Sequence, residues 1–107
     1  VLSLHNGIAE IECSCGRLRA SAFGKLAIGS TVEIMMRPEN LSFEKNAPDA
    51  NCMECVLKDG SFLGERTEWH LFSVNDPVMV FETASPARKS GQTYQLFIRP
   101  EHVIVMN

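Results

Sequence analysis

The chain has 107 residues, of which 45% are hydrophobic, and this length and composition fit one packed domain, since single domains commonly have about 100–150 residues. The longest apolar runs, 78–81 and 103–106, fall far short of the roughly 20 residues that a membrane-spanning helix needs. The net charge is −3 and the ten Lys and Arg residues are scattered, which excludes a basic patch of the kind that neutralises nucleic-acid phosphates.

The first half of the chain has a dominant period of two, which predicts β-strands. The strands predicted there are 8–13, 17–22, 32–37 and 41–43. Gly16 supplies the positive φ for a tight reversal between the first two strands, and residues 23–30 read as a loop. Residues 44–51 carry no apolar periodicity, so we expect a long loop or a seam between two halves there.

The second half continues the strand pattern. The strands predicted there are 52–57, 67–74, 78–83, 94–99 and 103–106. We expect the segment 58–65 to connect two of them, residues 75–77 to form a turn, and residues 84–92 to form a polar loop. About nine short strands without a helical period predict an all-β fold, an OB-like small barrel or sandwich.

An internal repeat links the two halves. When Gly29 is aligned with Gly91, the segments "GSTVEIMMRPENLSF" and "GQTYQLFIRPEHVIV" share Gly, Thr, Arg, Pro and Glu, and their apolar positions match. We therefore expect an internal two-fold repeat within one domain over 1–107, with halves of about 1–46 and 51–107.

The repeated tripeptide Arg-Pro-Glu predicts a strand end. Proline has no N–H to donate to a β-ladder, and it biases the preceding residue towards extended geometry. We expect Arg37 and Arg99 to be the last residues of their strands, each followed by a corner. Glu39 and Glu101 are candidates for pairing with these arginines, within one copy of the repeat or between copies.

Three segments together resemble the C-terminal region of ABC importer ATPase subunits of the spermidine/putrescine and ferric-iron type, which carries the TOBE (transport-associated OB) module. The segments are 32–43, 52–72 and 91–106, and the resemblance extends from about Gly7 to the end. The residues that carry it are Gly91 and the tripeptides Arg37-Pro38-Glu39, Phe62-Leu63-Gly64 and Arg99-Pro100-Glu101.

The resemblance implies an OB-like regulatory domain that is not catalytic, helps two ATPase subunits to dimerise, and in some members binds the solute or a regulatory protein. ATP and Mg²⁺ would then be bound by the parent ATPase domain, which docks on permease subunits at the cytoplasmic face of the membrane. The chain has no G-x-x-x-x-G-K-[ST] loop and begins with Val1, so we expect an excised, non-hydrolytic domain without a cofactor of its own.

A zinc site is the first alternative. Cys13, Cys15, Cys52 and Cys55 have paired spacing, but Cys52 and Cys55 would point to opposite faces of one strand, and reduced, buried thiols are the simpler expectation. The histidines have no Cys or carboxylate partner at ligand spacing; they are His5, His70 and His102. We therefore expect no metal site and no catalytic residue.

Two other functions stay open. OB-type barrels often bind oligonucleotides on aromatic platforms, but the acidic balance and the expectation that phenylalanines lie in the core argue against nucleic acid. By resemblance, some TOBE proteins bind molybdate-like anions between modules, and Ser30-Thr31 and Lys89-Ser90 are the only polar clusters at the repeat junctions.

The sequence thus favours a regulatory and dimerisation domain of an ABC importer for a small solute such as polyamine or iron, acting as a homodimer. The residues predicted to matter at the interface are Arg37, Glu39, Arg99 and Glu101 at the corners. Phe62, Leu63 and Gly64 are added as a motif in which glycine lets a strand bend or bulge.

Overall fold

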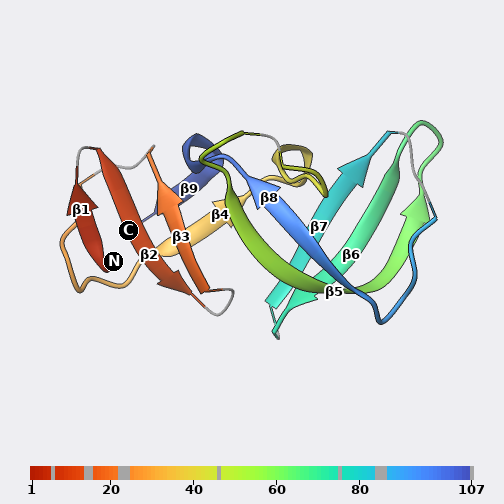
Figure 1. The fold of residues 1–107 in the computed structure, drawn as a ribbon, viewed down its shortest axis with the longest axis horizontal. Coiled ribbons are helices and arrows are strands. Elements are labelled where there is room, and N and C mark those ends of the chain that lie inside the picture. The colour runs from red at the N-terminus through yellow and green to blue at the C-terminus, as the bar shows by residue number, and fades with distance from the viewer. Residues whose placement is uncertain are drawn as a thin grey trace.

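The chain folds into β-strands joined by short connections (Figure 1), in a body of 41 × 24 × 22 Å. The computed structural model describes residues 1–5, 7–13, 16–21, 25–45, 47–74, 76–83 and 87–106. The first-half elements are β1 (Ser3–His5), β2 (Ile8–Cys13), β3 (Gly16–Ala20), β4 (Glu33–Met36) and the 3-10 helix η1 (Pro38–Asn40). The second-half elements are β5 (Asn51–Phe62), β6 (Thr67–Ser73), β7 (Asp76–Glu82), β8 (Thr93–Ile98), the 3-10 helix η2 (Pro100–His102) and β9 (Val103–Met106).

The strands form three antiparallel sheets in the described part of the chain. A three-stranded sheet has the order β1-β2-β3, a four-stranded sheet has the order β7-β6-β5-β8, and β4 pairs with β9. Figure 1 shows the first two sheets at opposite ends of the molecule, with the β4–β9 pair between them. The predicted all-β fold of about nine strands is confirmed, and the sheets pack as an open sandwich-like arrangement without closing into a barrel among the described residues.

Several predicted boundaries are wrong. β1 was not predicted, and residues 41–43 form only an isolated bridge at Ser42. The expected connector 58–65 is largely strand, because β5 continues to Phe62 and pairs with β6 across a register shift between Leu57 and Asp59. Asp76 and Pro77 belong to β7 instead of a turn. Proline is tolerated there because β7 is an edge strand.

The repeat includes two hairpins that lie outside the aligned segments 29–43 and 91–105. In the β2–β3 hairpin Cys13 pairs with Gly16, and in the β6–β7 hairpin Ser73 pairs with Asp76, 60 positions later in each case. Each hairpin is followed by a loop, a strand and a 3-10 helix, namely β4 with η1 and β8 with η2. The two halves are therefore variations of one strand order.

One hydrophobic cluster runs through all three sheets. Its buried members are Ala9, Ile11, Ala20, Leu41, Met53, Cys55, Leu57, Leu71, Val80, Leu96, Ile98, Val103 and Val105. The buried side chain of Asn51, the first residue of β5, connects the four-stranded sheet to β3 of the three-stranded sheet. Its Oδ1 accepts a hydrogen bond from Arg19 N at 2.8 Å, and its Nδ2 donates to Arg19 O at 2.8 Å. This amide completes the backbone pairing of β3 where no strand continues it.

The only helices in the described part of the chain are the two three-residue 3-10 turns. None of the described segments therefore has the length and hydrophobicity of a helical membrane span.

Candidate functional site

The two Arg-Pro-Glu corners have the same conformation. Arg37 (φ −77°, ψ 137°) and Arg99 (φ −68°, ψ 144°) are extended and directly follow β4 and β8, so each strand ends one residue earlier than predicted. Asn40 N donates to Arg37 O at 3.0 Å, and His102 N donates to Arg99 O at 3.0 Å. Proline starts each 3-10 turn, where a missing N–H removes no hydrogen bond.

The corner side chains are placed for contact with solvent or a partner. Arg37, Glu39, Arg99 and Glu101 are all exposed, whereas Pro100 is buried. Among the described residues, no ion pair joins Arg37 to Glu39. The two corners contact different strands: η1 packs against β7, and η2 packs against β3. Next to β3, Ser21 N donates a hydrogen bond to Pro100 O at 3.2 Å.

The second predicted motif lies at the tip of the β5–β6 hairpin. Phe62 is 77% exposed and Leu63 is 50% exposed. Leu63 N donates to Arg66 O at 2.7 Å, and Gly64 has a positive φ of 74°, which favours glycine at this tight reversal. Gly64 therefore makes a turn, and the bulge expected near it occurs instead between Leu57 and Asp59. The hairpin tip therefore exposes two adjacent apolar side chains.

The outer face of the four-stranded sheet is a feature that the sequence did not predict. We define it by the side chains on the face away from the buried cluster: Cys52, Glu54, Val56, Asp59, Glu68, His70, Phe72, Pro77, Met79, Phe81, Gln95 and Phe97. Val56 pairs with Phe72, and Phe72 pairs with Pro77, so an apolar stripe crosses three strands. Val56 remains 44% exposed and Met79 37% exposed.

The expectation that the phenylalanines lie in the core is wrong for the described ones. None of them belongs to the buried cluster, and Phe43 only packs against it. Phe72, Phe81 and Phe97 lie on the outer face. Large apolar residues occur on both faces of these strands. The period of two therefore could not show which face of the sheet is buried. Pro77 on an edge strand and the run of apolar residues 77–81 were the available signals.

Charged groups surround this stripe. The Lys58 Nζ lies 5.8 Å from the Phe72 ring centroid, and the Arg66 guanidinium carbon lies 4.0 Å from that of Phe81. His70, predicted to have no carboxylate partner, has its Nε2 2.8 Å from Glu68 Oε2 and its Nδ1 3.3 Å from Asp59 Oδ1. The register shift in β5 brings Asp59 opposite His70, which the sequence spacing could not reveal.

A cluster of hydrogen-bonded side chains lies on the inner side of the four-stranded sheet. Trp69 Nε1 donates to Glu82 Oε1 at 2.8 Å, and Arg88 Nε and Arg88 Nη2 donate to the two Glu82 oxygens, both at 2.8 Å. The Arg88 guanidinium carbon also lies 3.6 Å from the Phe43 ring centroid. The hydrogen bonds that Arg88 donates to the Glu82 carboxylate raise the pKa of Arg88 above its usual value. The two-point contact holds Arg88 against Glu82, the last residue of β7.

The cysteines do not form the four-thiolate site considered from the sequence. Cys13 is disulfide-bonded, which corrects the expectation of reduced thiols throughout, and Cys15 lies outside the described residues. Cys52 and Cys55 are free, and they point to opposite faces as predicted, Cys52 exposed and Cys55 buried. Burial raises the pKa of Cys55 to about 11, so this thiol is a poor nucleophile and metal ligand at neutral pH.

The fold and these surfaces define a class: a small, internally duplicated all-β domain with an exposed apolar sheet face. No protein-family model matches the chain, and no curated protein matches its sequence.

Proposed function

We propose that this chain is a regulatory and dimerisation domain of the ATP-binding subunit of an ABC importer for a small solute such as polyamine or iron. It has no catalytic role of its own in this proposal. ATP and Mg²⁺ belong to the parent ATPase domain, and the permease subunits hold that parent at the cytoplasmic face of the membrane. The TOBE-like segments of the sequence support the family, and the surface of the molecule supports a contact role.

The observation that carries the contact role is the outer face. Monomeric proteins rarely expose contiguous apolar patches larger than a few hundred Å², and larger patches with polar residues around them mark interaction sites. Val56, Phe72 and Met79 form the centre of the patch, and the pairs of His70 with Glu68 and Asp59 lie beside it. An apolar centre with a charged rim has the composition of a protein interface.

A second copy of the chain is the partner that we favour. An interface between two identical surfaces is self-complementary when it contains side chains of both signs. The outer face carries Glu54, Asp59 and Glu68, and Lys58 and Arg66 lie near its Phe72 and Phe81 rings. The corners add two arginines and two glutamates. These charges orient the contact more than they strengthen it.

Sedimentation of the purified chain over a range of concentrations tests this proposal. We expect a monomer–dimer equilibrium that the pair Val56→Lys and Met79→Lys shifts to monomer by at least tenfold, because it puts like charges in the apolar centre. The matched control is Ile28→Lys, since Ile28 is 66% exposed and lies outside the four-stranded sheet. A wild-type chain that stays monomeric at high concentration, or an Ile28 variant with the same effect, contradicts the contact role.

The parent is tested independently by the coding sequence that precedes Val1. An in-frame G-x-x-x-x-G-K-[ST] segment supports an ATPase parent, whereas a start codon directly before Val1 contradicts it. This test is separate from sedimentation, since the chain can self-associate without being part of a transporter.

One observation favours a second candidate, single-stranded nucleic acid. Phe72 and Phe81 on the outer face each have a cationic side chain over the ring, and aromatic platforms with adjacent cations bind unpaired bases. The three carboxylates on the same face oppose it. Titration with a fluorescent oligonucleotide decides: saturable, salt-dependent binding that Phe72→Ala weakens supports this candidate, and absence of binding at about 50 mM salt removes it.

A further inference from the structure

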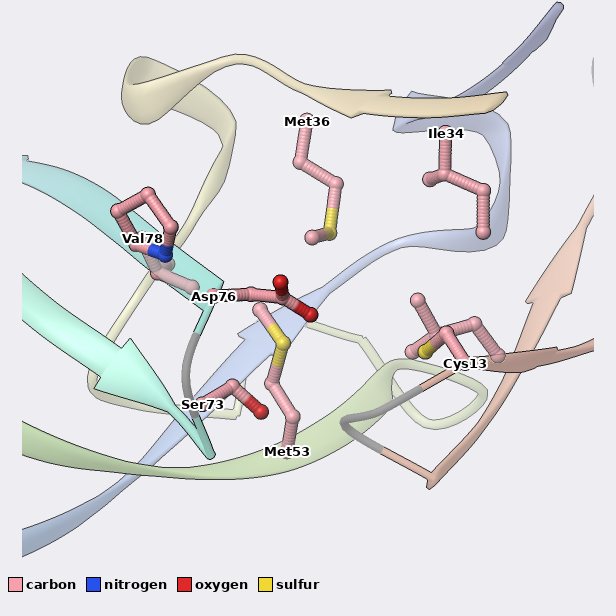
Figure 2. Close-up of a pocket in the computed structure, with 9 residues that line it drawn as sticks. Cys13, Ile34, Met36, Met53, Ser73, Asp76 and Val78 are labelled. Carbon is pink, nitrogen blue, oxygen red and sulfur yellow. The ribbon is translucent and has the colours of Figure 1, made fainter.

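A cavity of about 200 Å³ lies where the two halves of the molecule meet (Figure 2). It opens beside the turn ends of the two equivalent hairpins and beneath β4. Its lining is mainly apolar, formed by Cys13, Leu18, Ile34, Met36, Met53, Ser73, Asp76, Pro77 and Val78. We call this cavity the inter-repeat pocket.

The internal repeat explains where the pocket lies. Cys13 and Ser73 end equivalent strands, and Leu18 and Val78 are likewise 60 positions apart. Both pairs line the pocket, so equivalent surfaces of the two hairpins face each other across it. Asp76, which also lines the pocket, corresponds to Gly16 in the first hairpin. A carboxylate therefore comes from the second hairpin, and the equivalent position of the first hairpin has no side chain to match it.

That carboxylate is the charged group of the lining. Figure 2 shows the Asp76 side chain directed into the space between Met36 and Met53. No lysine, arginine or histidine is among the lining residues that the structure describes. The hydroxyl group of Ser73 is buried and hydrogen-bonded to Cys55. A ligand inside thus meets hydrocarbon, two thioether sulfurs and one negative group.

We propose that the inter-repeat pocket binds a small organic monocation, an ammonium group carried on a hydrocarbon body about the size of benzene. An apolar cavity of about 150 Å³ holds benzene, so the available volume accommodates such a body and one additional amine. The ammonium lies at the Asp76 carboxylate, and the body lies against Leu18, Met36 and Met53. Methionine side chains adapt to the shape of a ligand and contact aromatic rings favourably.

Other ligand classes fit this lining less well. An oxyanion such as molybdate would be repelled by the Asp76 carboxylate, and none of the described lining residues carries a positive charge to attract it. A soft metal ion such as Cu(I) is selected by a set of thiolate or thioether ligands, whereas the described lining offers two thioethers and Cys13 is in a disulfide. In the described part of the chain, no group of three or more His, Cys, Asp and Glu residues is arranged to hold a metal ion.

Three probes of one shape test the inference on the unaltered chain. Benzylammonium, benzyl alcohol and benzoate differ in the charge of a single substituent. We expect affinity to fall about tenfold from the ammonium to the alcohol, because hydrogen bonds to charged groups are stronger than neutral ones, and to fall further for benzoate. Equal affinity for the three probes, or no saturable binding of benzylammonium at millimolar concentration, would overturn the proposal.

The position of binding is read from the methyl resonances of isotope-labelled methionine. Met36 and Met53 line the pocket, whereas Met79 lies on the outer face and Met106 ends β9. Benzylammonium is expected to shift the first two signals and leave the other two in place. A shift confined to Met79 would place the ligand on the outer face and contradict the proposal.

A pair of matched variants tests the carboxylate. Asp76→Asn keeps the shape of the side chain and is expected to lower the affinity for benzylammonium about tenfold, while the affinity for benzyl alcohol stays the same. Asp59→Asn, on the outer face, is expected to leave both affinities unchanged. An unchanged preference for the ammonium in Asp76→Asn would overturn the assignment. The three-probe comparison decides the matter if this variant does not fold. The inference is independent of the proposed self-association, which has a separate readout.

Discussion

Ser42 pairs with Phe97 in an isolated antiparallel bridge, with both hydrogen bonds formed, at 3.0 Å from Ser42 N to Phe97 O and at 2.8 Å from Phe97 N to Ser42 O. Its counterpart is the pair of Met35 with Ile104 in the β4–β9 sheet. Phe97 follows Met35 by 62 positions, and Ile104 follows Ser42 by 62 positions. Each repeat therefore pairs the strand before its corner with the segment after the other repeat's corner.

This exchange of strand pairing between the repeats explains why each repeat has a sharp turn at Arg-Pro-Glu. Each chain segment must leave one strand, turn and pair with the opposite repeat within a few residues. The 3-10 turn starting at proline makes that change of direction, so Pro38 and Pro100 are explained by the fold. The turn itself requires neither the arginine nor the glutamate, whose side chains are exposed, and these four charges are therefore the place to test for contact with a partner.

The double substitution Arg37→Ala and Arg99→Ala is expected to weaken self-association about threefold to tenfold and to change the free energy of unfolding by less than about 0.5 kcal/mol. Exposed charges contribute little to folding but orient a contact. Sedimentation and urea unfolding measure the two effects. Lys45→Ala, which removes an exposed charge between the two halves, is the control. A large loss of stability would mean that the arginines act within the chain.

The connection between the two ends of the molecule gives a second prediction. Asn51→Ala removes both hydrogen bonds to the Arg19 backbone and leaves a part-buried N–H and C=O without these partners, so we expect about 1–2 kcal/mol of destabilisation in urea unfolding. Gln95→Ala, an exposed amide in the neighbouring strand β8, should change stability by less than about 0.5 kcal/mol. Equal effects of the two substitutions would show that the Asn51 bonds contribute little.

Sequence periodicity predicted the class of the fold and the corners, because proline and alternation act locally. It could not predict the exchange of strands between repeats, since that depends on contacts between segments far apart in the chain. The outer face was missed for a related reason: both faces of β6 and β7 carry large apolar residues. The inter-repeat pocket could not be predicted from the sequence either. Asp76 was expected in a turn, and its position in the pocket depends on the register of β7 with β6.

Gly60 is predicted to be indispensable for the packing of the only tryptophan. Gly60 and Trp69 are cross-strand partners, and a Cβ at position 60 would lie 2.5 Å from Trp69 Cε3. Gly60→Ala must therefore displace the indole ring, at a cost of about 1–3 kcal/mol. Urea unfolding and a changed Trp69 fluorescence maximum report this effect, and Ser61→Ala, one residue further along β5, serves as the control. An unchanged fluorescence maximum would contradict the displacement.

The polar cluster around Glu82 yields a stability prediction. The side chains of Arg88 and Glu82 are only 13% and 19% exposed, so Glu82→Gln leaves a poorly solvated guanidinium without its carboxylate. We expect about 2 kcal/mol of destabilisation, at the low end of what a broken buried pair costs because some solvent remains. Arg88→Lys should be similarly damaging, since lysine cannot form the two-point contact or stack on Phe43. Glu44→Gln, an exposed carboxylate nearby, should be neutral, and a neutral Glu82→Gln would refute the prediction.

The last prediction concerns alkaline pH. Burial raises the pKa of Cys55 from 9.0 in the unfolded chain to about 11 in the folded one. Below pH 9 the thiol is protonated in both states and its contribution to stability is fully present. Between these two pKa values only the unfolded state releases the proton, so the free energy of unfolding should fall by roughly 2 kcal/mol across this range. Cys55→Ala should lack this loss, whereas Cys52→Ala, at the exposed thiol, should retain it. The same pH dependence in both variants would assign the effect to other groups.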